Sequence, residues 1–123
     1  MKASDLRIGN WIEVFYGSGD KLYQQVDFIS ENLIECKPNL NIYGNTINYK
    51  PIPLTEEWLL KFGFSNLKQP NKRYFKHGKI SGGLFLGANY CNYKYTNIII
   101  DITSVHQLQN LYFALTGEEL KTK

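Results

Sequence analysis

The residues best suited to chemistry lie in one basic stretch, KQPNKRYFKHGK, which runs from Lys68 to Lys79. The stretch has five basic residues and no acidic residue. Lysine and arginine can neutralise phosphates, and aromatic rings can stack on nucleic-acid bases. The pattern therefore predicts a candidate nucleic-acid-binding surface made of Lys68, Lys72, Arg73, Tyr74, Lys76 and Lys79.

The same stretch also has a purely structural interpretation. If it forms a hairpin, the alternation of side chains along each strand turns some of its aromatic rings inward. Basic residues on an exposed strand also prevent unwanted pairing of a sheet edge. Nucleic-acid binding therefore requires that these side chains form one continuous exposed face.

A second candidate is His106, in the first turn of a predicted helix. A histidine there could act as a base, or bind an anion beside free backbone N–H groups. No second histidine lies nearby in the sequence, and no Ser/His/Asp or Cys/His set can be recognised. We therefore interpret His106 as a surface or boundary residue. The polar side of the helix leaves open a partner-binding surface made of His106, Gln107, Gln109 and Asn110.

The remaining polar residues show no catalytic or metal-binding pattern. Two pairs of glutamates, Glu56–Glu57 and Glu118–Glu119, lie at predicted helix ends, and their spacing does not define an acid/base pair. The GSGD and SGG segments lack the lysine and the following helix of a phosphate-binding loop. Cys36 and Cys91 form no CxxC motif, and we expect reduced thiols. The sequence predicts no catalytic residue, no cofactor and no metal.

The N-terminal half is predicted to consist of short strands. Residues 10–16, 21–30 and 33–36 have strand patterns and are separated by turn residues. This spacing predicts an SH3-like small β-barrel or a curled antiparallel meander. The Asn-, Gly- and Pro-rich segment 37–53, with a hairpin expected around Gly44–Asn45, marks a boundary. We expect subdomains at residues 1–53 and 54–123, packed together as one compact unit.

The C-terminal half is predicted to be an α-β-β-β-α unit, which makes the whole chain an α+β protein. Thr55 is expected to cap the first helix, and Gly63 is expected to end it. The apolar face of that helix contains Trp58, Leu59 and Phe62. Strands are expected at residues 73–77, 80–88 and 93–102.

The last predicted strand and helix have clear apolar faces. Ile98, Ile100 and Ile102 share one face of the strand, and we expect this face to meet the helices. Ser104 and Gln107 fit a capping box at the start of the final helix, and Gly117 is expected to end it. An apolar stripe at helical spacing follows, made of Val105, Leu108, Leu111, Tyr112 and Leu115.

Composition places the chain among folded proteins. It has 123 residues, of which 43% are apolar and 20% are charged. The first 53 residues carry five basic and six acidic residues, and the rest carry nine and five, so the net charge of +3 comes from the second half. The N-terminus lacks the apolar core of a signal peptide, and the longest aliphatic run is Ile98–Ile100. We therefore expect a cytoplasmic protein without a membrane segment.

Three segments together resemble a known family: MKASDLRIGNWIEV, PIPLTEEWLLKFGF and VHQLQNLYFALTGEEL. In this order they are similar to a family of small uncharacterised proteins encoded by gut Bacteroides-type bacteria, their phages and other mobile elements. The resemblance implies a bacterial or phage cytoplasmic origin and brings no known activity or site residue. We expect a non-catalytic accessory or adaptor protein that acts through a protein partner. The alternative is a nucleic-acid-binding protein that uses the basic stretch 68–79.

Overall fold

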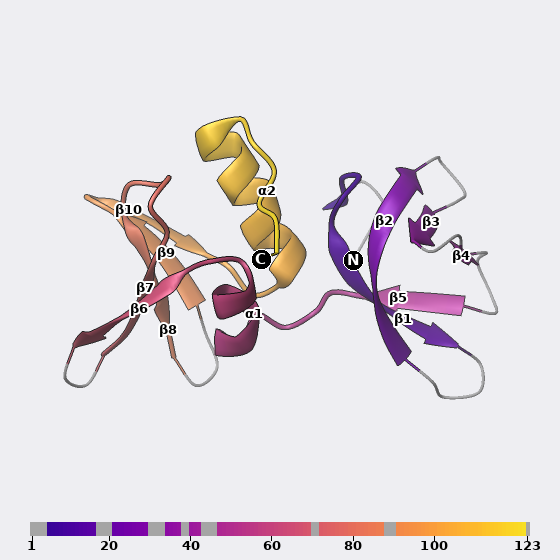
Figure 1. Ribbon diagram of the computed structural model, residues 1–123, viewed down its shortest axis with the longest axis horizontal. Coiled ribbons are helices and arrows are strands. Elements are labelled where there is room, and N and C mark those ends of the chain that lie inside the picture. The colour runs from indigo at the N-terminus through magenta and orange to yellow at the C-terminus, as the bar shows by residue number, and fades with distance from the viewer. Residues whose placement is uncertain are drawn as a thin grey trace. The chain divides into compact units, whose positions relative to one another are not determined.

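The computed structural model describes residues 5–16, 21–29, 34–37, 40–42, 47–69, 72–87 and 91–122 (Figure 1). The chain divides into two compact units, Met1–Ile52 and Pro53–Lys123. The boundary expected from the sequence, after Pro53, falls at the neighbouring residue. Neither helix in the described ranges is long and apolar enough to cross a membrane. The protein is a mixed α+β structure, mostly strands, with two antiparallel sheets and two helices among the described residues.

The N-terminal unit contains one antiparallel sheet. Its strands are β1 (Trp11–Tyr16), β2 (Lys21–Ile29), β3 (Ile34–Lys37), β4 (Leu40–Ile42) and β5 (Ile47–Lys50). The strand order is β4-β3-β2-β1-β5, so the first four strands form a meander and β5 returns to the free edge of β1. No hydrogen-bonded pairing closes β4 onto β5 in the described part of the sheet. The hairpin expected around Gly44–Asn45 lies outside the described residues.

The core of the N-terminal unit follows the alternation of β1. Ile12 and Val14 are fully buried and pack with Val26 of β2 and with Leu6. Just before β1, Gly9 has a φ of 96° and its N–H donates to the carbonyl of Val26 at 2.7 Å. Glycine suits this position because residues with a Cβ rarely adopt a positive φ. The glycine before the first strand therefore sets how the chain enters the sheet.

Helix α1 (Glu56–Lys61) begins and ends as its sequence predicts. Thr55 is the N-cap, and its hydroxyl accepts from the N–H of Trp58 at 3.4 Å. Gly63 has a φ of 89°, and the N–H of Phe64 donates to Leu59 O at 3.0 Å. Together with the bond from the Gly63 N–H to Leu60 O at 3.0 Å, this bond forms the Schellman motif expected at this end. A short helix is marginal alone, and this one is held by its buried apolar face, which comprises Trp58, Leu59 and Phe62.

The C-terminal sheet has more strands than the sequence predicts. They are β6 (Ser65–Gln69), β7 (Lys72–Lys76), β8 (Gly83–Leu86), β9 (Cys91–Tyr95) and β10 (Ile98–Asp101), paired in chain order. The expected three strands are wrong in two places. Strand β6 is polar and has no apolar alternation to reveal it. The single strand expected over residues 93–102 is a hairpin, which turns at Thr96 with a φ of 53°. Threonine is not a usual residue for positive φ, so this turn carries no glycine signal.

Helix α2 (Val105–Thr116) ends at Gly117, whose φ of 75° and N–H bond to Phe113 O provide the expected C-cap. Its start differs from the predicted capping box. The Ser104 side chain makes no capping bond, and Gln107 Oε1 instead accepts from Thr103 N at 2.8 Å. Of the predicted apolar stripe, Val105, Leu108 and Tyr112 are buried, Leu111 is half-buried and Leu115 is exposed.

Candidate protein-binding surface

In the sheet of the C-terminal unit, the side chains on one face become more exposed towards β10. The strand register places Phe75, Leu84, Tyr93 and Ile100 side by side across one face. Their exposed fractions are 0%, 0%, 3% and 39%. Residues opposite each other in an antiparallel pair point to the same face. The buried core of this unit therefore ends at β9, and β10 continues the same face into solvent.

Four apolar side chains of the β9–β10 hairpin are exposed, and we call them the hairpin surface: Tyr95, Ile98, Ile99 and Ile100. Their exposed fractions are 44%, 52%, 61% and 39%. The register puts Ile98 opposite Tyr95 on the face of Ile100, and Ile99 on the reverse face beside Lys94. Large apolar residues scattered singly are normal on a surface, but a contiguous group marks an interaction site.

The expectation that the isoleucine face meets the helices is wrong for two of its three members. Ile98, Ile100 and Ile102 do share one face, since alternate residues along a strand point to the same side of the sheet. Ile102 is buried, but Ile98 and Ile100 are exposed. The reason is position, because β10 is the last strand in the sheet order. Apolar periodicity identifies an apolar face, but it does not show whether other elements of the same unit bury that face.

The backbone of β10 also presents hydrogen-bonding positions that no other strand in the described ranges uses. Residues along an antiparallel strand bond alternately to one side and the other. The N–H of Ile102 donates to Cys91 O at 2.8 Å, so Ile98, Ile100 and Ile102 bond towards β9. The N–H and C=O groups of Ile99 and Asp101 therefore point away from the sheet. β10 contains no proline, lysine or bulge, three of the means of blocking an edge strand, and its protection is limited to its short length and to Asp101.

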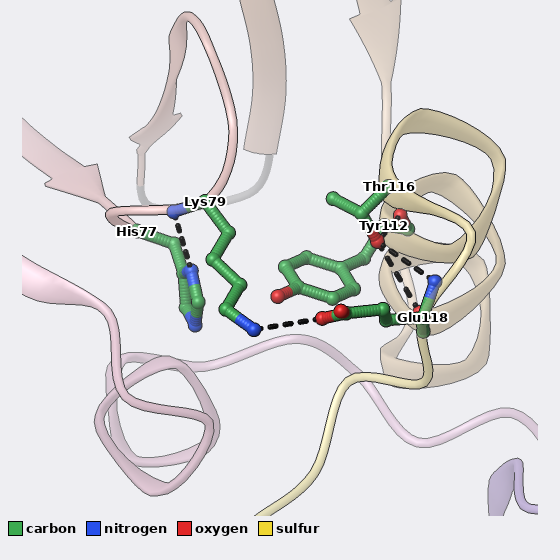
Figure 2. Close-up of polar contacts among 5 residues, drawn as sticks. All are labelled: His77, Lys79, Tyr112, Thr116 and Glu118. Carbon is green, nitrogen blue, oxygen red and sulfur yellow. Dashed lines mark hydrogen bonds and ion pairs between the residues drawn. The ribbon is translucent and has the colours of Figure 1, made fainter.

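A second feature of this unit is an open cavity of about 540 Å³. Its lining comprises His77, Lys79, Tyr112, Glu118, Glu119, Leu120 and Lys121. Figure 2 shows Tyr112 pointing towards His77 and Lys79, with Lys79 joined to Glu118. The His77 ring packs edge-on against Tyr112 and Phe64, at centroid distances of 5.0 and 5.2 Å. The His77 ring thus packs the end of β7 against α2.

The polar groups of the cavity largely satisfy one another. The backbone N–H of Lys79 donates to His77 Nδ1 at 3.2 Å, so in this bond Nδ1 carries no proton. Lys79 Nζ lies 2.7 Å from Glu118 Oε2. This hydrogen-bonded ion pair raises the pKa of Lys79 and lowers the pKa of Glu118. Opposite charges that are already paired favour a structural role over a catalytic one.

The predicted nucleic-acid residues are only partly brought together. Lys76 Nζ donates to the carbonyls of Ile80 at 3.2 Å and Gly82 at 2.9 Å, and Lys79 pairs with Glu118. The Tyr74 ring packs on Phe85 with a centroid distance of 4.7 Å. The backbone register sets Lys68 opposite Arg73 and Gln69 opposite Lys72. The side chains of Lys68, Lys72 and Arg73 lie outside the described part of the structure, so the continuous basic face stays a prediction.

The polar residues of α2 do not form one exposed surface. His106 and Gln109 are buried, Asn110 is half-buried and Gln107 is exposed. His106 Nδ1 lies 3.2 Å from Ser104 Oγ, and Gln107 Oε1 accepts from Thr103. The sequence interpretation of His106 as a surface or boundary residue missed its burial. Helical spacing identifies the most apolar side of a helix, but it does not show that a polar side is also covered.

The hairpin surface is the functional candidate that sequence reasoning missed. Its signal was the run Ile98–Ile100, since three consecutive aliphatic residues make a strand apolar on both faces. The thiol of Cys91 is free and buried, and burial raises its pKa to about 11, which favours the unreactive protonated form. No cluster of three or more potential metal ligands occurs among the described residues. Comparisons with protein-family models, with curated proteins and with solved structures find no match.

Proposed function

We propose that this chain is a non-catalytic accessory or adaptor protein of a prophage or mobile element, and that it acts through a protein partner bound at the hairpin surface. The observation that carries the proposal is the exposure of Tyr95, Ile98, Ile99 and Ile100 on a strand with a free edge. The prophage or mobile-element origin rests on the resemblance of the three sequence segments. The same resemblance supports a cytoplasmic location.

The energetics favour a protein partner at this surface. Full burial of an isoleucine side chain stabilises by about 1.5–3 kcal/mol, so covering each half-exposed isoleucine contributes about 1 kcal/mol. Tyr95 adds a large aromatic side chain of the kind enriched at interface centres. Lys94 and Asp101 are exposed beside the apolar residues and supply a polar rim. A polar rim around an apolar centre is typical of protein interfaces.

For the N-terminal unit, the SH3-like small barrel belongs to the same proposal. The meander of β1 to β4 and the return of β5 to β1 are compatible with a sheet that curls towards closure. Such a unit would serve as a second binding module of an adaptor.

The proposal is tested by photo-crosslinking in cells that express the protein. Benzoylphenylalanine replaces Ile99, which is 61% exposed, and a control carries it at Leu60, an apolar residue of α1 that is 48% exposed. We expect a defined protein adduct from position 99 that is absent from position 60. The adduct should disappear when Ile98 and Ile100 are both changed to lysine. Loss of all protein adducts at position 99, or the same adducts from both positions, would refute the proposal.

Nucleic-acid binding through residues 68–79 remains the alternative. It is tested by fluorescence-anisotropy titration with single- and double-stranded oligonucleotides at low and physiological salt. A variant with Lys72, Arg73 and Lys76 changed to glutamate is the control. Binding that survives physiological salt, weakens steeply with salt and vanishes in the variant would favour this alternative.

A further inference from the structure

We infer that the protein partner at the hairpin surface is a second copy of this chain, with β10 of each copy pairing antiparallel about a two-fold axis at Ile99. The inference rests on the proposed function, because it names the occupant of the surface proposed there. It joins the two C-terminal sheets into one continuous sheet.

The backbone of β10 is self-complementary. The N–H and C=O of Ile99 both point away from β9, as shown above from the alternation of bonds. In an antiparallel pair, two such residues placed opposite each other exchange both hydrogen bonds. With Ile99 opposite Ile99 of the second copy, Asp101 falls opposite Asn97. The outward-pointing residues of β10 are Ile99 and Asp101, and in this register they lie opposite Ile99 of the second copy and Asn97 in its turn.

The side chains also match in this register. Ile98 falls opposite Ile100 of the second copy, on the face that continues the core of the unit. Ile99 meets its own copy on the reverse face. Cross-strand β-branched pairs of this kind stabilise a sheet. The pairing would give Ile98, Ile99 and Ile100 apolar neighbours across the seam, whereas Tyr95 lies one strand away on β9.

The neighbouring registers match less well than the register centred on Ile99. Asp101 is the only charged residue of β10, and in the Ile99-centred register it lies opposite the amide of Asn97. An axis at Ile100 would instead place the carboxylate of Asp101 opposite Ile99. An axis at Ile98 would leave Ile100 opposite Thr96 in the turn and leave Asp101 outside the pairing. Register is strongly specified when a slip sets polar groups against apolar ones.

The opposite edge of the same sheet lacks this pattern. Strand β6 has the sequence SNLKQ, with one lysine and one aliphatic residue. A lysine discourages edge-to-edge pairing, whereas the sequence IIID in β10 contains no such residue. The difference between the two edges favours β10 as the one that receives another strand. Because the shared strand is short, the dimer belongs to the class of small, weak interfaces.

The inference is tested by sedimentation velocity of the full chain from about 1 μM to about 1 mM, a range chosen for weak association. We expect a concentration-dependent monomer–dimer equilibrium. Ile99→Lys sets two lysines against each other at the axis and should raise the dimer dissociation constant at least about tenfold. Leu22→Lys is the matched control, since Leu22 is an exposed residue of the N-terminal unit, and it should leave the dimer unchanged. Circular dichroism verifies that each variant is folded.

The register itself is tested by a complementary pair of variants. Ile98→Lys and Ile100→Glu should each weaken the homodimer, because each places a charge opposite an isoleucine. When mixed, they should form a heterodimer in which the new lysine faces the new glutamate. A wild-type chain that stays monomeric throughout the range would overturn the inference. A dimer indifferent to Ile99→Lys, or a mixture that fails to associate, would do so equally.

These outcomes separate the inference from the proposed function. A monomeric chain whose position 99 crosslinks to a different protein would overturn the second-copy inference and leave the adaptor proposal standing. A monomeric chain without protein adducts, or with an adduct inside its own chain, would overturn both.

Discussion

Replacement of Gly83 by alanine should destabilise the C-terminal unit through one side chain, Tyr74. Gly83 is buried in β8, and a Cβ at this position would overlap the ring of Tyr74. Tyr74 also packs on Phe85 with a centroid distance of 4.7 Å. The ring lies over the glycine because that position has no side chain. An added methyl must therefore displace Tyr74 or distort the pairing of β7 with β8.

The expected magnitude follows from two terms. Inserting a methyl group into a well-packed site costs about 1–3 kcal/mol. Displacing Tyr74 from Phe85 forfeits up to about 1.5 kcal/mol of aromatic interaction. Alanine recovers about 0.5–1 kcal/mol because it is less flexible than glycine in the unfolded chain. We therefore expect Gly83→Ala to lower the free energy of unfolding of this unit by about 2 kcal/mol, within the range of these terms.

A double-mutant cycle with Tyr74→Ala isolates the proposed contact. Without the ring, Gly83→Ala should become neutral or stabilising by about 0.5 kcal/mol. The destabilising effect of Gly83→Ala is therefore removed or reversed in the Tyr74→Ala background. A strand glycine that acted only through backbone flexibility would show no such change.

The assay is urea unfolding followed by tryptophan fluorescence. The chain has two tryptophans, Trp11 in the N-terminal unit and Trp58 in the C-terminal unit. In a Trp11→Phe background, the buried Trp58 reports on the C-terminal unit alone. If Gly83→Ala is equally destabilising with and without Tyr74, the contact between this ring and position 83 does not control stability, and the reasoning is refuted.

Three further predictions concern the same unit. Thr96→Gly should raise the free energy of unfolding by about 1 kcal/mol in the urea assay, because a β-branched residue at a φ of 53° is strained, and an unchanged or lower stability would contradict this. Lys79→Met should raise the pKa of Glu118 towards its ordinary value of 4.5 in an NMR titration, with Lys61→Met as the control, and equal shifts in both variants would count against the ion pair. In the wild type, the Glu118 carboxylate stabilises the folded unit above its unfolded pKa, and this stabilisation is lost as the pH falls through the lower folded pKa. The raised pKa of Lys79 has the opposite pH dependence. Its stabilisation is present below 10.5 and is lost as the pH rises through the folded pKa. Cys91, with a pKa of about 11, should resist alkylation by iodoacetamide at pH 8 until urea unfolds the unit, and rapid labelling of the folded protein, read by mass spectrometry, would show that the thiol is accessible.

Local signals in the sequence predicted the ends of the helices well. Thr55 and Gly63 cap the two ends of α1, and Gly117 caps the end of α2, through bonds that stay within one turn of each helix. Their roles depend on hydroxyl chemistry and on backbone freedom, which belong to single residues. The failed capping box shows the limit of this reasoning. Gln107 does reach back, but it bonds to Thr103 and not to the N-cap residue.

Strand boundaries in the C-terminal unit were harder to predict. The turn between β9 and β10 is formed by Thr96 and Asn97, a pair without the glycine that marks tight hairpins. Strand β6 was missed because its polar sequence is held by pairing with β7 and not by an apolar face. The local sequence of a strand does not reveal its pairing partner, because pairing depends on where the other strands of the sheet lie.

The sequence by itself determined which surfaces are apolar: the alternating face of β1, the apolar faces of α1 and α2, and the run Ile98–Ile100. Only the tertiary structure decided which of these surfaces are buried. Ile12 and Val14 lie within their sheet and are buried, whereas Ile98, Ile99 and Ile100 lie on an edge strand and are exposed. The physical reason is that apolar character is a property of a side chain, while burial depends on neighbours from other strands and helices. The candidate surface of this protein arises from that difference.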